Sequence, residues 1–397
     1  MAANKIILNK KFLIILFVLA FFPYVFHNSL VERRLFVNEI FSLTGLLFFI
    51  TLKRSKWNLI VNKNIIEVLV IFFLLNCIIY LFLSIPFATN IYYYLRNSVI
   101  FYSVFSFFLG YYIFDGFVEI HKYFRRVIKY SVFSFIFFEI HRLLGYFGGS
   151  IALAFSFKKI TLLSGALLIL FNIIYTRNFE QSTALAIGFF LFYALIFRSF
   201  RFFKFLVISG IVILLSLILY LSPALKQYKY PPYRLYGNTT AVIQAEPLFL
   251  IDPNSAFRFI LYYRLLIEDF PGNIIGKGFG TPLFKYEPGM NTADSRGDDE
   301  HDAHVTGAHS TFITIFSRLG IMSLIIFILL YYNFFKEYFK YFKYYNNKGY
   351  LLFFIAFISI SIIGIFNLVL ETPIFASMYW LILGFVSKSI DERKKEN

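Results

Sequence analysis

The chain has 397 residues, of which 59% are hydrophobic and 15% are charged, and its formal net charge is +16. An ordinary soluble domain is about one quarter charged, so this composition excludes a soluble globular protein and favours a chain that lies mostly in a membrane. The excess of basic residues does not indicate nucleic-acid binding, because it is confined to short connections between apolar runs.

Apolar runs of about 17–22 residues recur from residue 12 to residue 385, and each is long enough to cross roughly 30 Å of hydrocarbon. The first run is followed by no small-residue cleavage site, so we interpret it as a retained span and not as a signal peptide. A short apolar stretch at 148–157 is needed as a sixth span to complete the topology. The sequence thus predicts an all-α polytopic membrane protein with about twelve transmembrane helices. The predicted spans are 12–28, 35–52, 64–86, 96–114, 127–144, 148–157, 161–177, 182–198, 203–222, 311–331, 350–370 and 374–388.

The distribution of charge predicts which connections face the cytoplasm. Residues 223–310 hold 8 Lys and Arg against 10 Asp and Glu, whereas the remainder of the chain has a net charge of +18. Basic residues concentrate on the cytoplasmic side of membrane proteins, which places both termini inside and the 223–310 loop in the periplasm. We therefore divide the chain into N-terminal transmembrane helices (1–222), a large periplasmic loop (223–310) and C-terminal transmembrane helices (311–397). The basic segments are 53–56, 122–129, 198–204, 336–348 and 393–395.

The large loop is predicted to be partly helical. Asp252-Pro253 has the pattern of a helix start, and Pro271-Gly272 that of a helix stop. Residues 255–270 between them alternate apolar and polar faces at helical spacing. Such a helix can lie along a membrane surface. A loop of this length on a membrane bundle is typical of a functional segment.

The segment Gly307-Ala308-His309-Ser310-Thr311 leads directly into the next span. Helical spacing predicts that His309 shares one face with Gly320, at the outer end of the helix. Histidine titrates near neutrality and can accept a proton from a sugar hydroxyl, which makes His309 a candidate general base. The alternative is an interfacial histidine that only ends the span.

This segment resembles the signature of the O-antigen ligase and polymerase family, in which a histidine and asparagine precede a glycine-containing turn of helix. The family's preceding pattern is similar to Arg258, Pro271-Gly272 and the loop Gly276-Lys277-Gly278-Phe279-Gly280. Two further segments are similar to the family's pattern. One is Arg142 followed by Gly145-Tyr146-Phe147, and the other is Glu371-Thr372-Pro373 in the last outer loop. Two features depart from the family. Ser310 replaces the asparagine. Many family members also have Ser-Arg at the start of the span that corresponds to 182–198, where this chain has Glu180-Gln181-Ser182-Thr183.

The resemblance implies an inverting glycosyltransferase of the bacterial inner membrane whose donor is a polyprenyl-diphosphate-linked oligosaccharide. In that reading His309 is the base, Ser310 hydrogen-bonds substrate, and Arg258 and Arg142 stabilise the departing diphosphate. The backbone N–H groups around Gly276, Gly278 and Gly280 are expected to bind the diphosphate as well. Each of these groups has an alternative without a function. Arg258 could be a surface arginine of an amphipathic helix, Arg142 an arginine at the end of a span, and the glycine loop at 276–280 a plain turn.

The same resemblance implies partners and competing functions. The partners are the lipid bilayer and the lipid-linked oligosaccharide, with a chain-length regulator as a further candidate and no nucleic acid. We favour a polysaccharide polymerase over an O-antigen ligase that transfers glycan to lipid A-core. A lipid-linked oligosaccharide flippase is the alternative of another class, and the 88-residue loop argues against it. No cofactor is implied.

Several further charged residues are candidates for a functional role. The acidic and histidine-rich segment 294–304 has oxygen ligands suited to Ca²⁺, Mg²⁺ or Mn²⁺, but we favour a solvated loop tip and predict no metal site. Arg318 lies within its predicted span and is assigned to packing or to binding the lipid-linked substrate. Glu371 is a candidate pairing or sugar-binding group in the last outer loop.

Overall fold

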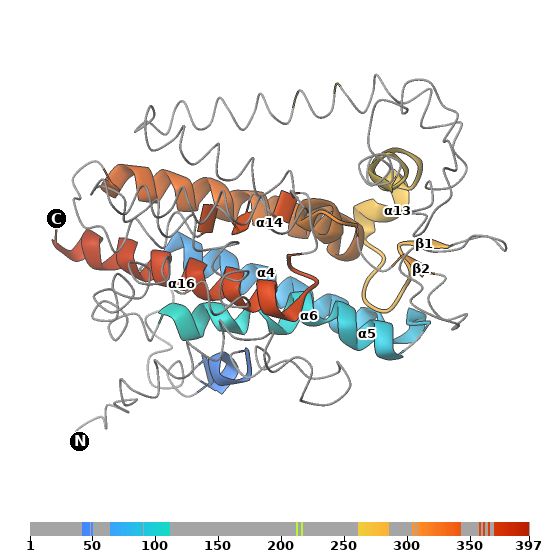
Figure 1. The fold of residues 1–397 in the computed structure, drawn as a ribbon, viewed down its shortest axis with the longest axis horizontal. Helices are drawn as coiled ribbons and strands as arrows, with labels where there is room; N and C mark the ends of the chain where they lie inside the picture. The colour runs from blue at the N-terminus through green and yellow to red at the C-terminus, as the bar shows by residue number, and fades with distance from the viewer. Residues whose placement is uncertain are drawn as a thin grey trace, which may run out of the picture.

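The computed structural model describes residues 42–47, 49–50, 64–89, 91–111, 212, 216, 261–285, 304–305, 308–342, 357–358, 360–361, 364–365 and 369–396. These residues are mainly helical, with one short antiparallel strand pair. The long helices lie lengthwise beside one another, and the short elements α13, β1 and β2 gather at one end (Figure 1). In chain order the elements are α4 (Ile65–Leu83), η2 (Ile85–Phe87), α5 (Ile91–Asn97), α6 (Val99–Tyr102), η3 (Arg264–Glu268), α13 (Phe270–Ile275), β1 (Phe284–Lys285), β2 (His304–Val305), α14 (Thr311–Phe342) and α16 (Pro373–Glu396).

Helix α4 has local signals at both ends. The Asn64 side chain accepts a hydrogen bond from the Ile66 N–H over 2.9 Å, which caps the first turn. The helix ends at Leu83 with Ser84 as its C-cap, two residues before Pro86, whose ring cannot continue it. Its 19 residues span roughly 28 Å at 1.5 Å per residue. The prediction of a helix at 64–86 is therefore confirmed.

Two described helices are long and apolar enough to cross a membrane. They are α4 and the Thr311–Tyr341 part of α14. The helix predicted at 311–331 is present but extends to Phe342, and the one predicted at 374–388 begins at Pro373 and extends to Glu396. The spans predicted at 12–28, 127–144, 148–157, 161–177 and 182–198 lie outside the described residues.

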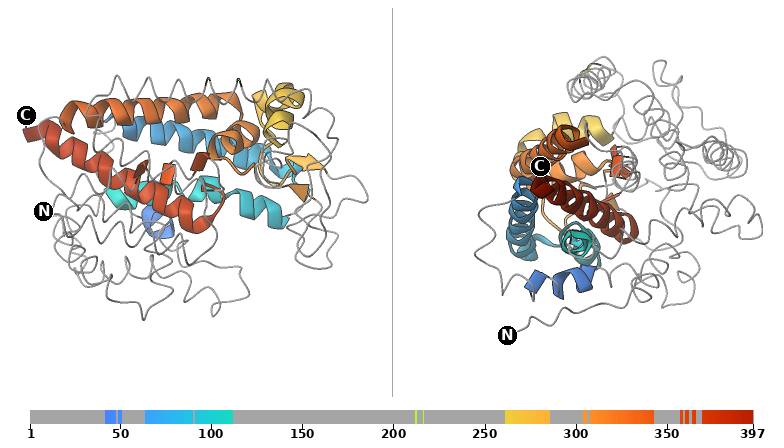
Figure 2. Two further views of the ribbon diagram at one scale, coloured as in Figure 1. Left: turned by 45° about the horizontal axis from the view of Figure 1, so that its top comes forward. Right: turned by 90° about the vertical axis from the view of Figure 1, so that its left-hand side faces the viewer.

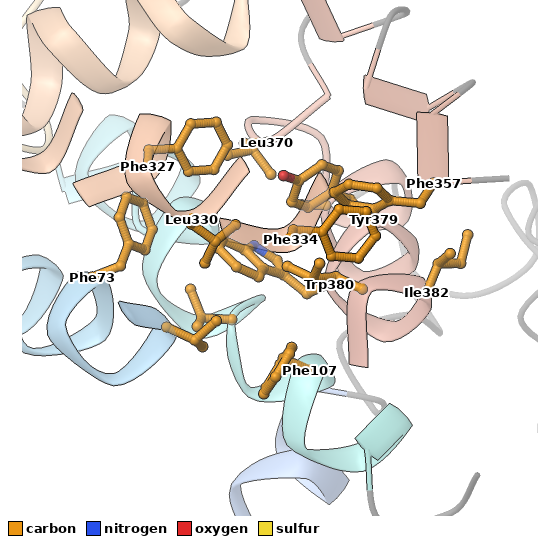
Figure 3. Packing of buried hydrophobic residues seen from close by; sticks show 14 of the residues in the cluster. Phe73, Phe107, Phe327, Leu330, Phe334, Phe357, Leu370, Tyr379, Trp380 and Ile382 are labelled. Atoms are coloured by element: carbon orange, nitrogen blue, oxygen red, sulfur yellow. The ribbon is translucent and has the colours of Figure 1, made fainter. Parts of the chain in front are cut away.

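Aromatic side chains hold the long helices together. The Phe73 ring of α4 lies 5.7 Å from that of Phe327 on α14 and 5.5 Å from that of Trp380 on α16 (Figure 3). Aromatic pairs at this separation add roughly 0.5–1.5 kcal/mol to the energy of burial. The helices α4, α14 and α16 lie close together in the view from one end (Figure 2), and all three contribute residues to one buried hydrophobic cluster.

Glycine permits close contacts between helix backbones. A Cβ atom added to Gly384 of α16 would lie 2.2 Å from the carbonyl oxygen of Phe107, and one added to Gly110 would lie 2.2 Å from that of Leu381. The two backbones therefore touch, as small residues allow in helix pairs within membranes. In the span predicted at 96–114, the described residues 96–111 are helical as predicted but with interruptions after Asn97 and again at 103–104.

The helical prediction for the large loop needs one correction. Residues 261–275 are helical almost throughout, but Pro271 lies in the first turn of α13 instead of ending a helix. Proline is tolerated there because the N–H it lacks has no partner in a first turn. The helix start predicted at Asp252-Pro253 lies outside the described residues.

Candidate functional site

His309 lies in a turn just before α14, and its backbone φ is +51°. Within the described part of the chain it is the one residue other than glycine with a positive φ. A left-handed backbone costs roughly 1–2 kcal/mol for a residue with a Cβ atom and persists only where surrounding contacts enforce it. One such contact is a hydrogen bond of 2.9 Å from the Tyr262 hydroxyl to the His309 carbonyl oxygen. The His309 side chain is partly exposed.

The start of α14 corrects the predicted position of His309. The helix begins at Thr311, and the Thr314 N–H donates to the Ser310 carbonyl oxygen over 2.8 Å. Ser310 is therefore the N-cap residue, and it is 3% exposed. The prediction that His309 shares a helical face with Gly320 is wrong, because His309 precedes the helix. Contact between Ser310 and substrate stays a prediction.

Residues 276–280, the glycine loop, pack backbone against backbone. Gly276, Gly278 and Gly280 have φ values of +93°, +72° and +77°, a region that glycine occupies without steric cost. A Cβ atom added to Gly276 would lie 2.5 Å from the backbone nitrogen of Gly320. The glycines are therefore required by the close approach of this loop to α14.

The glycine loop donates hydrogen bonds to α14 at a point where that helix is interrupted. At Gly320 the backbone has φ +72° and ψ −179°, which interrupts the helix. In a continuous helix the carbonyl oxygens of Ser317 and Arg318 would accept from the N–H groups four residues later. Here the Lys277 N–H donates to Ser317 over 2.7 Å, and the Gly278 N–H donates to Arg318 over 2.9 Å. The loop thus provides the hydrogen bonds that the broken helix lacks.

The remaining N–H groups of the loop also donate within the protein. The Phe279 N–H donates to Ser84 Oγ over 2.8 Å, and the Gly280 N–H to Asn97 Oδ1 over 3.2 Å. The Gly276 N–H donates to the Gly272 carbonyl oxygen over 3.2 Å. The expectation that these amides are free to bind a diphosphate is therefore wrong for this geometry. Contact of the three glycines with substrate by other means stays a prediction.

Arg318 is a buried connection between α14 and the glycine loop. Its side chain is 0% exposed. The guanidinium donates to the carbonyl oxygen of Gly278 over 3.0 Å and also to that of Thr281, and its charge faces Glu371. These contacts agree with the packing role assigned from the sequence. A role in binding lipid-linked substrate stays a prediction.

Glu371 lies between α14 and the turn that holds His309. The residue is 9% exposed, and neither carboxylate oxygen has a hydrogen bond of regular geometry within the described residues. Burial raises the pKa of this carboxyl to about 7, and four groups that face it oppose that shift. These groups are the Arg318 charge, the Thr314 hydroxyl, the Arg96 charge and the Ala308 N–H.

This buried carboxyl predicts how stability depends on pH. Its pKa is about 7 in the folded protein against an ordinary value of 4.5, so the folded state takes up a proton between these values. The contribution of this carboxyl to folding stability should be largest below pH 4.5, fall as the pH rises to about 7 and then level off, with a total loss on the order of 3 kcal/mol. The check is the melting temperature of detergent-solubilised wild-type protein and of Glu371→Gln across this range. The difference between the two should follow this curve, and a constant difference would contradict it.

Two other cations near the loop already have carboxylate partners. Lys277 Nζ lies 2.8 Å from Asp269 Oδ2 and also donates to the Leu283 carbonyl oxygen. Arg264 Nε lies 3.9 Å from Glu268 Oε2. The arginines expected to stabilise the diphosphate, Arg142 and Arg258, lie outside the described residues, as does the 294–304 segment apart from His304 of β2.

Sequence reasoning did not link two distant residues to this site. The Tyr262 hydroxyl bonds the His309 carbonyl oxygen from 47 residues away in the chain, and Arg96, which is more distant still, faces Glu371. No local pattern connects such residues to the histidine. Glu371 was noted as a pairing group, and its contact with Arg318 agrees with that reading.

The described residues thus define a helical protein with two helices of membrane-spanning length and a polar site at one end of them. Comparison with known proteins adds no family to this description: no family model matches the sequence, and no curated protein or solved structure matches it either.

Proposed function

We propose that this chain is a membrane glycosyltransferase that joins polyprenyl-diphosphate-linked oligosaccharide units into a surface polysaccharide. The observation that carries the proposal is the strained turn at His309. A non-glycine residue held at positive φ in a partly exposed turn is a feature that clusters at functional sites. The resemblance of the sequence to the O-antigen polymerase and ligase family supports the same residue.

The membrane location is part of the proposal. Only 33% of the apolar window of α4 is buried within the protein, whereas the core helix of a soluble protein would be mostly buried. Phe72, Ile79 and Phe82 on α4 are 54%, 52% and 65% exposed, and contiguous apolar surface of this kind is unusual in water. We propose about twelve spans in the bacterial inner membrane, with both termini in the cytoplasm and residues 223–310 in the periplasm.

The proposed reaction needs a base on one side of the sugar and positive charge on the other. A hydroxyl oxygen of the acceptor attacks the anomeric carbon, and its proton passes to a ring nitrogen of His309. The bond between the anomeric carbon and the phosphate oxygen breaks, and the electron pair leaves with the lipid diphosphate. Arg258 and Arg142 remain our candidates for stabilising that anion, because guanidinium groups pair with phosphate in a bidentate manner.

An O-antigen ligase would use the same chemistry with lipid A-core as acceptor, and it is our second candidate. Ser310 in place of the family's asparagine makes us favour the polymerase. A flippase for lipid-linked oligosaccharides is the alternative of another class, and it would need no base at the outer end of α14.

The test is a reconstituted assay. Purified protein in liposomes should convert polyprenyl-diphosphate-linked repeat units into a ladder of longer chains, with release of the lipid diphosphate, when lipid A-core is absent. A product that forms only when lipid A-core is present would identify a ligase. Transfer of intact donor across the bilayer with no new glycosidic bond would exclude both enzymes.

A further inference from the structure

The Tyr262 hydroxyl bonds the His309 turn on its carbonyl side. The O–H donates to the His309 carbonyl oxygen over 2.9 Å, across 47 residues of chain. The hydrogen-bond pattern of α14 does not use this oxygen, because the helix begins at Thr311 and its first accepting carbonyl is that of Ser310, which takes the Thr314 N–H. A buried carbonyl group just before a helix needs a partner from elsewhere. Tyr262 provides that partner at the residue whose backbone is left-handed.

The ring of Tyr262 packs in a small hydrophobic cluster with residues from both sides of His309. Tyr262 is 5% exposed. Ala308 and Ile313 belong to the same buried cluster. The other buried members are Leu261, Leu265 and Leu283. Apolar packing thus places the ring against the segment that carries the histidine, and the hydroxyl lies within bonding distance of the carbonyl oxygen.

The helix that carries Tyr262 changes its hydrogen-bond pattern two residues later. Arg264–Glu268 is the π-helical turn η3, and the Asp269 N–H donates to the Arg264 carbonyl oxygen, five residues back, over 2.8 Å. Such turns occur mostly as single insertions within α-helices and are frequent at functional sites. The insertion changes which side chains share a face of the helix. Here Tyr262 contacts the His309 turn, while Asp269 contacts the glycine loop.

The segment from Tyr262 to Lys277 is bonded to α14 at a second point as well. Asp269 Oδ2 lies 2.8 Å from Lys277 Nζ. The Lys277 N–H in turn donates to the Ser317 carbonyl oxygen of α14 over 2.7 Å. One attachment therefore lies before the first turn of α14, and the other lies near its break. Two attachments to the same helix fix the position of the Tyr262 hydroxyl relative to that helix.

We infer that Tyr262 is a positioning residue for His309: its hydroxyl holds the carbonyl group of the left-handed turn, so that the imidazole keeps one direction. This inference rests on the proposed function, in which His309 is the base. Tyr262 does not contact the reacting atoms in this role. The direction of a side chain follows from the backbone that carries it, and a misplacement of about 1 Å at a reacting group can lower a rate about 100-fold.

Two substitutions of single hydroxyl groups test the inference. Tyr262→Phe removes the hydroxyl and keeps the ring in its cluster. The matched control is Tyr263→Phe, because Tyr263 is also buried, at 7% exposed, and within the described residues its hydroxyl makes no hydrogen bond to the turn. Both variants should give monodisperse protein at the wild-type level. Misfolding of Tyr262→Phe alone would show that the hydroxyl supports the whole fold, which would contradict a local role.

The first measurement is hydrogen exchange followed by mass spectrometry in detergent, which requires no enzymatic activity. A hydrogen bond of this kind shifts a local equilibrium about 2-fold to 10-fold. We expect the peptide 308–313 to exchange faster by about this factor in Tyr262→Phe and at the wild-type rate in Tyr263→Phe. The peptide 325–335, within α14, should exchange equally in all three proteins. Unchanged exchange of peptide 308–313 in Tyr262→Phe would overturn the inference even if the glycosyltransferase assignment is correct.

The second measurement is the rate with purified polyprenyl-diphosphate-linked repeat units. We expect kcat to fall about 10-fold to 100-fold in Tyr262→Phe with KM within about 2-fold of the wild type, and both constants to be unchanged in Tyr263→Phe. An unchanged kcat in Tyr262→Phe, whether or not KM rises, would exclude the positioning role. A wild-type protein without transferase activity would remove the proposed function and with it that role, while the exchange result would still decide whether Tyr262 holds the turn.

Discussion

Replacing His309 by Asn should abolish long-chain polysaccharide while leaving the amount of folded protein unchanged. Asparagine tolerates the left-handed backbone that His309 adopts, so the turn can be retained without added strain. Its side-chain amide cannot take up a proton near neutral pH, so the general base is lost. Removing such a base lowers a rate by about 100-fold to 10,000-fold. The measurement is the rate of chain extension in the reconstituted assay, together with the melting temperature.

His309→Ala and His304→Ala complete this comparison. The Ala variant loses the base and also destabilises the turn by roughly 1 kcal/mol, because alanine has a Cβ atom and no compensating contact at positive φ. His304 lies in β2 of the same loop, and its replacement should leave the rate near that of the wild type. Normal chain length in His309→Asn would exclude His309 as the base and remove the main support for the proposed reaction.

Replacing Gly320 by Ala should prevent stable folding. A Cβ atom at this position would lie 2.4 Å from the carbonyl oxygen of Ile275 and 2.7 Å from that of Ile274. Both contacts are with backbone, which cannot move aside without displacing α13. The φ and ψ values at Gly320 also fall in a region that glycine alone occupies readily. The combined cost should be at least about 3 kcal/mol, which is large relative to the total stability of a typical domain.

Gly272→Ala is the matched control for this prediction. Gly272 lies in α13, and a Cβ atom there would meet no atom within 4 Å. Alanine also favours a helix over glycine by about 1 kcal/mol, so this variant should fold as well as the wild type. The measurement is the fraction of monodisperse protein after detergent extraction, with its melting temperature. Recovery of Gly320→Ala at the level of Gly272→Ala would contradict the role we assign to the helix break.

The sequence by itself determined the features that depend on local composition. Continuous apolar runs identified α4 and α14 as helices of membrane length. In an apolar medium the backbone N–H and C=O groups must bond to one another, and a helix of about 20 residues achieves this within one segment. The span predicted at 64–86 contains α4, and the segment around His309 was recognisable from its residue types and order. The glycine pattern also predicted a loop at Gly276, Gly278 and Gly280. We had expected its N–H groups to bind a ligand, whereas they donate within the protein.

Only the tertiary structure decided how these segments meet. Nothing in the local pattern shows that the Lys277 N–H donates to the Ser317 carbonyl oxygen 40 residues later in α14, or that Glu371 faces Arg318. The left-handed turn at His309 was likewise hidden, because helical spacing favoured a continuous helix through this residue. Each of these features is a contact between distant residues. Periodicity and residue preference describe only neighbours along the chain, whereas these contacts arise when the folded protein must satisfy buried N–H and C=O groups.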